Sequence, residues 1–172
     1  MSGADDGGGP AAPAREYIPF NSQAEYQAAV DRLLAQQGRE LRIFDPDLAA
    51  LQLNTRARVE AIERFLRASR TRRIYIAVHD TGHLTRHCPR MMSLLARYSH
   101  AIQVNRTVEE IRGVQDSFLV LDAAHYVRRP VAAYFRGAAG FHDETEALAM
   151  RGRFLEIWAA SEPGVSGATT GL

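Results

Sequence analysis

The feature that most constrains the fold is an uninterrupted apolar run, Phe118 to Leu121, which ends at the carboxylate of Asp122. A strand without polar residues needs cover on both faces, which is typical of a sheet between two layers of helices. We therefore expect an α/β fold, with a mixed, mostly parallel sheet and helices on both faces. Asp122 follows the carboxyl end of this strand, where open α/β sheets usually bind their ligands.

Helix and strand signals alternate along the rest of the chain. Helix-capping patterns are found at Ser22, Asn54, Thr107 and Asp143, and a further helix is expected from about Leu84 to Tyr98. Extended segments are predicted at 41–44, 73–79, 101–104, 117–121, 126–128 and 131–136. This order of elements agrees with one sheet covered on both faces.

The chain has 172 residues and 46% hydrophobic content, which suits one domain. Residues 1–15 are mostly Gly, Ala, Pro and Asp, so we expect a disordered tail there, a single α/β domain over 16–162, and a flexible tail over 163–172. No signal-peptide pattern or membrane span of about 20 apolar residues is found. Together with the single cysteine, Cys88, this predicts a bacterial type of cytoplasmic location and no membrane partner.

All 21 basic residues are arginine, and the chain contains no lysine. Schiff-base chemistry and the Walker-type phosphate loop both need a lysine, so the sequence excludes them. The formal net charge is only +1, and overall charge therefore does not attract nucleic acid or an anionic membrane. Any binding of anions must come from local groups of arginines.

The densest group of polar residues lies between His79 and Arg90, at a predicted turn from a strand into a helix. A helix amino terminus presents unpaired N–H groups, which favours bound phosphate. The predicted anion-binding residues are His79, Asp80, His83, Arg86, Arg90, Asp122, Arg129 and Arg136. In the alternative interpretation, these arginines pair only with nearby carboxylates and form a rim without a ligand.

The same segment allows a second interpretation, in which its histidines bind a metal ion. His83 and His87 are one helical turn apart, and neutral imidazoles are ordinary zinc ligands, so His79, His83 and His87 are the candidates. No HExxH or paired-cysteine pattern accompanies them. We therefore expect no bound metal and no cofactor.

From about Leu41 to Ser161, the chain resembles one half of a phospholipase D superfamily domain, the half that carries a His-x-Lys-x4-Asp motif. With Asp122 at the position of the motif's Asp, Gln115 stands where the family has its nucleophilic His and Ser117 where it has its Lys. The family's downstream Gly-Ser-x-x-Asn motif falls on Arg129, Pro130 and Ala133.

The resemblance implies a degenerate, non-catalytic domain, a pseudoenzyme that acts as an interaction or anionic-ligand (phosphate or nucleotide) binding module. Since family halves pair across a two-fold axis, it also implies a homodimer. The chain is similar, too, to a group of small bacterial domains that occur alone or joined to GNAT-type acetyltransferases, which implies an acetyltransferase-type partner.

Two other functions stay open. One is a metal-assisted hydrolase or phosphodiesterase of an unorthodox type, acting through the three histidines or without the usual motif. The other is a weak nucleic-acid-binding domain, in which aromatic residues that alternate with arginine stack on bases. These aromatic residues are Tyr126, Tyr134, Phe135 and Phe141.

Overall fold

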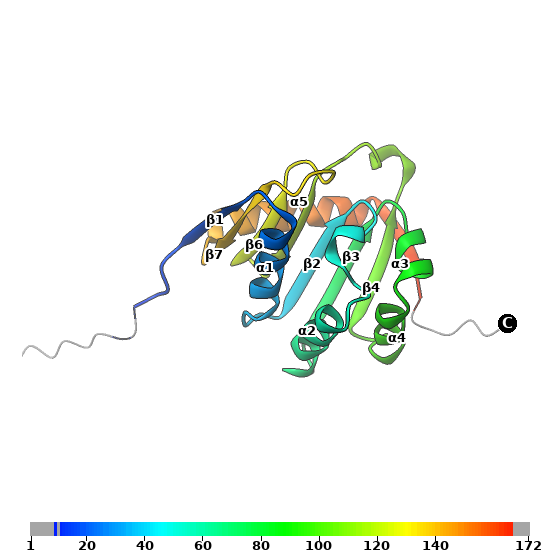
Figure 1. Ribbon diagram of the computed structural model, residues 1–172, viewed down its shortest axis with the longest axis horizontal. Coiled ribbons are helices and arrows are strands. Elements are labelled where there is room, and N and C mark those ends of the chain that lie inside the picture. The colour runs from blue at the N-terminus through cyan, green and yellow to red at the C-terminus, as the bar shows by residue number, and fades with distance from the viewer. Residues whose placement is uncertain (1–8, 10, 167–172) are drawn as a thin grey trace, which may run out of the picture.

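The computed structural model describes residue 9 and residues 11–166 (Figure 1). Its strands are β1 (Glu16–Phe20), β2 (Glu40–Asp45), β3 (Arg73–Val78), β4 (Ile102–Thr107), β5 (Ser117–Leu121), β6 (His125–Arg129), β7 (Gly137–Phe141) and β8 (Ser161–Val165). Its helices are α1 (Gln23–Leu34), α2 (Arg56–Arg67), α3 (Gly82–His87), α4 (Pro89–Arg97) and α5 (Glu144–Ala159), with short 3-10 turns η1 (Ala49–Leu51) and η2 (Glu109–Ile111).

The strands form one sheet in the order β1-β7-β6-β5-β2-β3-β4-β8. The expected mixed α/β sheet is confirmed, but the expectation that it is mostly parallel is wrong. Only the neighbours β2, β3 and β4 run parallel, while β1, β5, β6, β7 and β8 each pair antiparallel. A turn of three residues connects β5 to β6 and a loop of seven residues connects β6 to β7, and both are short enough to join antiparallel strands.

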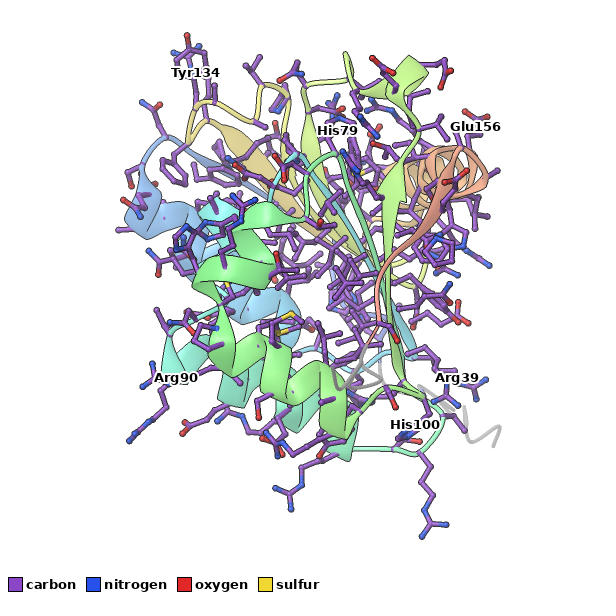
Figure 2. The ribbon with its side chains drawn as sticks, turned by 90° about the vertical axis from the view of Figure 1, so that its right-hand side faces the viewer. Arg39, His79, Arg90, His100, Tyr134 and Glu156 are labelled. Carbon is purple, nitrogen blue, oxygen red and sulfur yellow. The ribbon has the colours of Figure 1, made fainter. Side chains whose placement is uncertain are left out.

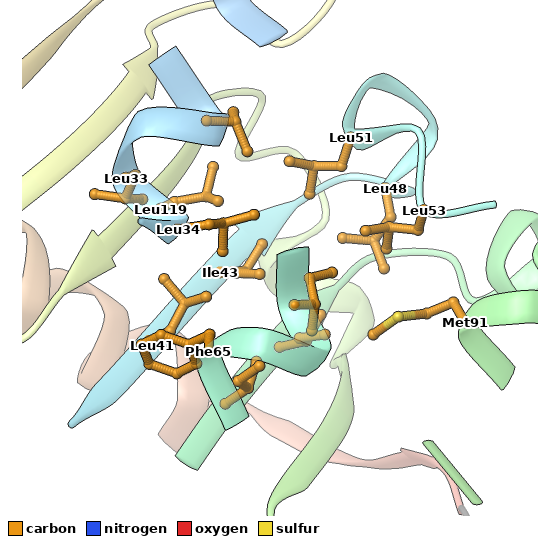
Figure 3. Close-up of a cluster of buried hydrophobic side chains, with 14 of the residues drawn as sticks. Leu33, Leu34, Leu41, Ile43, Leu48, Leu51, Leu53, Phe65, Met91 and Leu119 are labelled. Carbon is orange, nitrogen blue, oxygen red and sulfur yellow. The ribbon is translucent and has the colours of Figure 1, made fainter. Parts of the chain in front are cut away.

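Helices cover both faces of the sheet, as expected. α1, α2, α3 and α4 lie on one face and α5 lies on the other (Figure 1). The residues of β5 alternate between two buried clusters: Leu119 and Leu121 join the larger one under α1 and α2, which Figure 3 shows in part, and Phe118 and Val120 join the smaller one under α5. This explains why the strand has no polar side chain between Phe118 and Leu121.

Several element boundaries differ from those that the sequence predicts. Ser22 and Asp143 cap their helices as expected, but the cap of α2 is Thr55, so the prediction of Asn54 is wrong. Pro89 divides the expected helix 84–98 into α3 and α4, because proline cannot donate a helical hydrogen bond. The strand expected at 131–136 is a loop, and the strand β7 follows it.

The two predicted tails lie partly outside the described residues, which leave out 1–8, 10 and 167–172. Residues 163–165, the start of the predicted flexible tail, belong to β8 and pair with β4. β1 likewise starts at Glu16 and pairs with β7. Among the described helices, none combines the length and the apolar character that crossing a membrane requires.

Candidate functional site

Buried polar side chains gather at one edge of the sheet, which we call the carboxyl edge. There the parallel strands β2, β3 and β4 end, β5 begins and β6 ends. The buried polar residues at this edge are Asp45, His79, Thr107, Asp116, Ser117 and Arg129. His79 lies toward this end of the molecule in Figure 2, where the exposed loop residue Tyr134 is also found.

Asp45, the last residue of β2, is the centre of this group. One carboxylate oxygen accepts hydrogen bonds from the Ser117 hydroxyl at 2.5 Å and from an Arg129 Nη at 2.6 Å. The other oxygen accepts the backbone N–H groups of Asp47 at 3.1 Å and Leu48 at 2.7 Å. Asp45 and Arg129 are each 2% exposed, so they form a buried ion pair in which the carboxylate already has four donors.

Arg129 is held from several sides. Its other Nη donates to the Ala132 carbonyl at 2.6 Å, and its guanidinium lies 4.7 Å from the centre of the Tyr26 ring. Burial raises the pKa of Tyr26 to about 12, so this ring keeps its hydroxyl proton at neutral pH. Arg129 also lines a pocket of about 430 Å³ with Gln115 and Phe135. The arginine is therefore fixed by Asp45 and its ring neighbours rather than held free for a ligand.

His79 uses both of its ring nitrogens within the protein. Nδ1 lies 2.7 Å from the Thr107 hydroxyl, and Nε2 lies 2.6 Å from the Val114 carbonyl oxygen. Since a carbonyl oxygen only accepts, the neutral ring carries its proton on Nε2 and accepts the Thr107 hydroxyl at Nδ1. Neither nitrogen faces a position that a substrate or a metal ion would occupy.

Gln115 and Ser117 occupy the positions aligned with the family's nucleophilic His and its Lys. Gln115 is exposed on the wall of the 430 Å³ pocket, and its amide nitrogen donates to the Arg112 carbonyl at 3.2 Å. Ser117 is buried against Asp45. An amide is not a nucleophile and a buried hydroxyl carries no positive charge, so these two side chains reproduce neither role.

Asp122 lies at the opposite edge of the sheet, which corrects the expectation that it lies close to Arg129 and Arg136. β5 runs antiparallel to β2, so its carboxyl end meets the start of β2 rather than the end. The Asp122 carboxylate accepts the backbone N–H groups of Arg39 at 3.1 Å and Glu40 at 2.9 Å. Asp122 therefore binds the chain's own backbone, at the left-handed φ of 52°.

The predicted residues between 80 and 90 do not converge on one cleft. Asp80 accepts the Gly82 N–H at 2.7 Å, and Arg90 donates to the Asn54 carbonyl at 2.9 Å on the side of the molecule away from His79 (Figure 2). Arg86 is exposed on α3. The structure therefore separates Arg90 and Asp122 from the buried group at the carboxyl edge.

The three candidate metal ligands are not brought together as a set. The rings of His83 and His87 lie 5.5 Å apart between centroids, while His79 is already committed to Thr107 and Val114. Within the part of the chain that the structure describes, no group of three or more His, Cys, Asp or Glu side chains has the arrangement to hold a metal ion.

A second pocket, of about 480 Å³, opens on the surface of β6 and β7 beside α5, and we call it the arginine pocket. Its charged and aromatic lining residues are Arg15, Tyr17, Tyr126, Arg128, Arg136 and Glu146. Burial, with the neighbouring carboxylates of Asp143 and Glu146, raises the pKa of Tyr126. Of these residues the sequence predicts Arg136 as an anion-binding residue, but it gives no signal that Arg15 and Tyr17 join it through β1.

The arginines of this pocket are only partly neutralised. Arg136 is exposed, and among the described residues it has no hydrogen-bond or ion-pair partner. Arg128 lies 3.8 Å from Asp116, but Arg153 already binds that carboxylate with both terminal nitrogens. Of the predicted anion-binding residues, Arg136 is therefore the one with a free guanidinium at a pocket.

Comparison with protein families assigns most of this structure to one family. A family model matches residues 22–166, which contain α1, all of the carboxyl edge and β8. The chain belongs to the family described as "Domain of unknown function (DUF7931)". No curated protein matched this DUF7931 chain.

Solved structures show the same fold at low sequence identity. Nuc from Salmonella typhimurium, a phospholipase D family member, has a TM-score of 0.61 at 11% identity, and the match covers 89% of this chain and 100% of Nuc. NucT from Helicobacter pylori has a TM-score of 0.57 at 13% identity, with coverages of 88% and 100%. The phospholipase D-like fold expected for this DUF7931 chain is thus confirmed.

A third similar structure is that of TrmBL2, an archaeal chromatin protein with a novel mode of DNA binding. Its TM-score is 0.62 at 10% identity, and the match covers 87% of the DUF7931 chain. This chain spans only 55% of TrmBL2. At these identities, the comparison establishes the fold that the chains share.

Proposed function

We propose that this chain is a non-catalytic domain of phospholipase D-like fold that binds a phosphate-bearing ligand in the arginine pocket. The observation that carries the proposal is the unpartnered guanidinium of Arg136 beside Arg128, in a pocket of about 480 Å³. A guanidinium presents a planar set of donors that suits phosphate oxygens. Tyr17 and Tyr126 supply aromatic walls for the organic part of a nucleotide.

The carboxyl edge supports the non-catalytic part of the proposal. Phosphoryl transfer through a covalent intermediate needs a free nucleophile and a cationic group that holds the phosphate. At this edge the imidazole of His79 is saturated, and Arg129 is neutralised by Asp45. The metal-assisted alternative has less support for the same reason, since His79 would have to give up both of its present partners.

Calorimetry with inorganic phosphate and a nucleoside monophosphate tests the binding part of the proposal. We expect binding in the millimolar range for phosphate and tighter binding for the nucleotide. The Arg136→Gln variant is expected to bind both about tenfold more weakly or worse, because the substitution removes a charge-assisted contact. An Arg56→Gln variant loses the same charge at the exposed start of α2 and serves as the control. Equal binding by Arg136→Gln and wild type contradicts the assignment of the pocket.

An assay with bis(p-nitrophenyl) phosphate tests the non-catalytic part separately. We expect no turnover above the buffer rate. Turnover that is abolished by Gln115→Ala or Ser117→Ala would show that the carboxyl edge is catalytic.

The homodimer and the acetyltransferase-type partner remain predictions from the sequence. Light scattering of the purified chain measures the oligomeric state directly.

A further inference from the structure

A run of arginines surrounds the end of α2 and the start of β3. Residues 64–73 contain five arginines and no acidic residue. Arg64 and Arg67 are in the last turn of the helix, where a positive charge also complements the helix dipole. The dipole effect fades beyond that turn, so it does not account for Arg70, Arg72 and Arg73.

The parallel strands bring other basic residues to the same place, the edge of the sheet opposite His79. The Arg73 N–H donates to the Arg39 carbonyl at 2.9 Å, and the Ile74 N–H donates to the Ala101 carbonyl at 2.8 Å, next to His100. Figure 2 shows Arg39 and His100 near one end of the molecule, and His79 near the other. We define the amino-edge surface as Arg39, Arg67, Arg70, Arg72, Arg73 and His100.

The acidic residues near this surface are already engaged. Glu40 pairs with Arg42, Glu63 pairs with Arg97, and Asp122 accepts backbone N–H groups. Among the described residues, the guanidinium groups of Arg39, Arg67 and Arg70 have no hydrogen-bond or ion-pair partner.

The remaining two guanidinium groups of the surface also keep their charge. That of Arg73 donates only to backbone carbonyl oxygens, and that of Arg72 lies 4.7 Å from the centre of the Phe65 ring. Since no carboxylate neutralises either of them, the amino-edge surface keeps a positive charge although the whole chain has a formal net charge of only +1.

A groove of about 380 Å³ adjoins these arginines. Arg73, Tyr75, His100 and Gln103 line it, with residues of β8 on the far side. Such a groove suits a sugar or an unstacked base, because the arginine at its rim can bind a phosphate while the aromatic and amide groups inside contact the base. The large exposed hydrophobic residues of the described chain all lie elsewhere: Tyr17, Ile18, Val131, Tyr134, Leu148 and Leu155.

We propose that the amino-edge surface binds the backbone of a single-stranded nucleic acid. Neighbouring strands lie about 4.8 Å apart, so the starts of β2 and β4 are about 10 Å apart. Basic side chains at the starts of these strands can therefore contact more than one phosphate of the same extended strand. Among the described residues, none of the large exposed hydrophobic side chains lies at this surface, which disfavours an anionic membrane or a protein partner, because both are usually held by inserted or buried apolar side chains.

Fluorescence anisotropy with a labelled 20-nucleotide single-stranded DNA tests the proposal. Between 50 and 300 mM NaCl, the logarithm of the affinity of wild type is expected to fall linearly with the logarithm of salt concentration. The Arg67→Gln/Arg70→Gln variant is expected to bind about tenfold more weakly at 100 mM NaCl. Its salt slope is expected to be smaller by about 1.4, because about 0.7 is lost for each phosphate contact on a single strand.

The matched pair of controls lies on one helix. Arg56 and Arg67 are the first and last residues of α2, both are exposed, and Arg56→Gln changes the net charge as much as Arg67→Gln does. We expect Arg56→Gln to bind within about twofold of wild type. Equal losses of DNA affinity in Arg56→Gln and Arg67→Gln would show that only net charge matters, and would overturn the proposal.

Three further outcomes overturn the assignment. The first is no binding to the oligonucleotide at 50 mM NaCl. The second is binding to phosphatidylserine vesicles, lost in Arg67→Gln/Arg70→Gln, without binding to DNA. The third is DNA binding that Arg136→Gln abolishes and Arg67→Gln/Arg70→Gln leaves intact, which would place the DNA in the arginine pocket. Phosphate binding by that pocket is measured in a different assay, so the two proposals succeed or fail separately.

Discussion

Asp45 neutralises the one arginine that is fully buried at the carboxyl edge. Replacing Asp45 with alanine leaves the Arg129 guanidinium buried without a carboxylate, and the Ser117 hydroxyl without its acceptor. We expect the Asp45→Ala variant to lose about 3–5 kcal/mol of unfolding free energy, as measured by urea denaturation followed by circular dichroism. The exposed neighbour Asp47, changed to alanine, is expected to cost about 1 kcal/mol or less.

A double variant separates the charge effect from the loss of packing. Asp45→Ala/Arg129→Met removes both charges and keeps a long apolar side chain in the place of Arg129. We expect it to be more stable than Asp45→Ala alone, because it leaves no unpaired buried charge. If Asp45→Ala/Arg129→Met is less stable than Asp45→Ala, the unpaired buried charge is not the reason why Asp45→Ala loses unfolding free energy.

Individual residues show what the sequence can and cannot predict about the site. The hydrophobic run before Asp122 correctly predicts a buried strand, and Arg136, predicted to bind an anion, is exposed in the structure. The apolar pattern of a strand does not encode its direction in the sheet, however, so the pattern does not predict at which edge Asp122 lies. Asp45 also ends a predicted strand, but Arg42 interrupts the apolar pattern of that strand, so the sequence gives no reason to prefer Asp45.

At the scale of elements, local signals predicted the helices better than the strands. The capping residues Ser22 and Asp143 are confirmed by the structure. The prediction failed at β7, whose sequence is Gly-Ala-Ala-Gly-Phe. Glycine and alanine have low strand propensity, and a Cβ atom at either of the two glycines, Gly137 and Gly140, would collide with β6.

Gly140 provides a test of this explanation. A Cβ atom at Gly140 would lie 2.2 Å from the Tyr126 ring, and that ring is buried. We therefore expect Gly140→Ala to lower the free energy of unfolding by about 1–3 kcal/mol in urea denaturation. Gly152 in α5 has no neighbour within 4 Å of such an atom, so Gly152→Ala is expected to raise the unfolding free energy by up to about 1 kcal/mol. Equal effects at both positions would contradict the packing argument.

At the scale of the whole molecule, β8 covers the edge of β4 and completes the sheet. A chain that ends at Ala160 lacks β8, so the backbone groups with which Val104–Thr107 pair to β8 become unpaired, while β4 keeps its pairing with β3 on the other side. Such an edge pairs with other chains, so we expect this variant to be less stable and to self-associate at about 100 µM, as measured by size-exclusion chromatography with light scattering. A chain that ends at Ser166 keeps β8 and is the control, and we expect it to elute like the full chain.

The polar contacts at the two ends of β5 have a consequence for folding. Ser117 is anchored to Asp45 at one end of the strand, and Asp122 is anchored to the amides of Arg39 and Glu40 at the other. A slip of two residues would keep every apolar side chain on its proper face, so hydrophobicity alone tolerates it. Both anchors would be lost at once in that misalignment, so together they select a single register of β5 against β2.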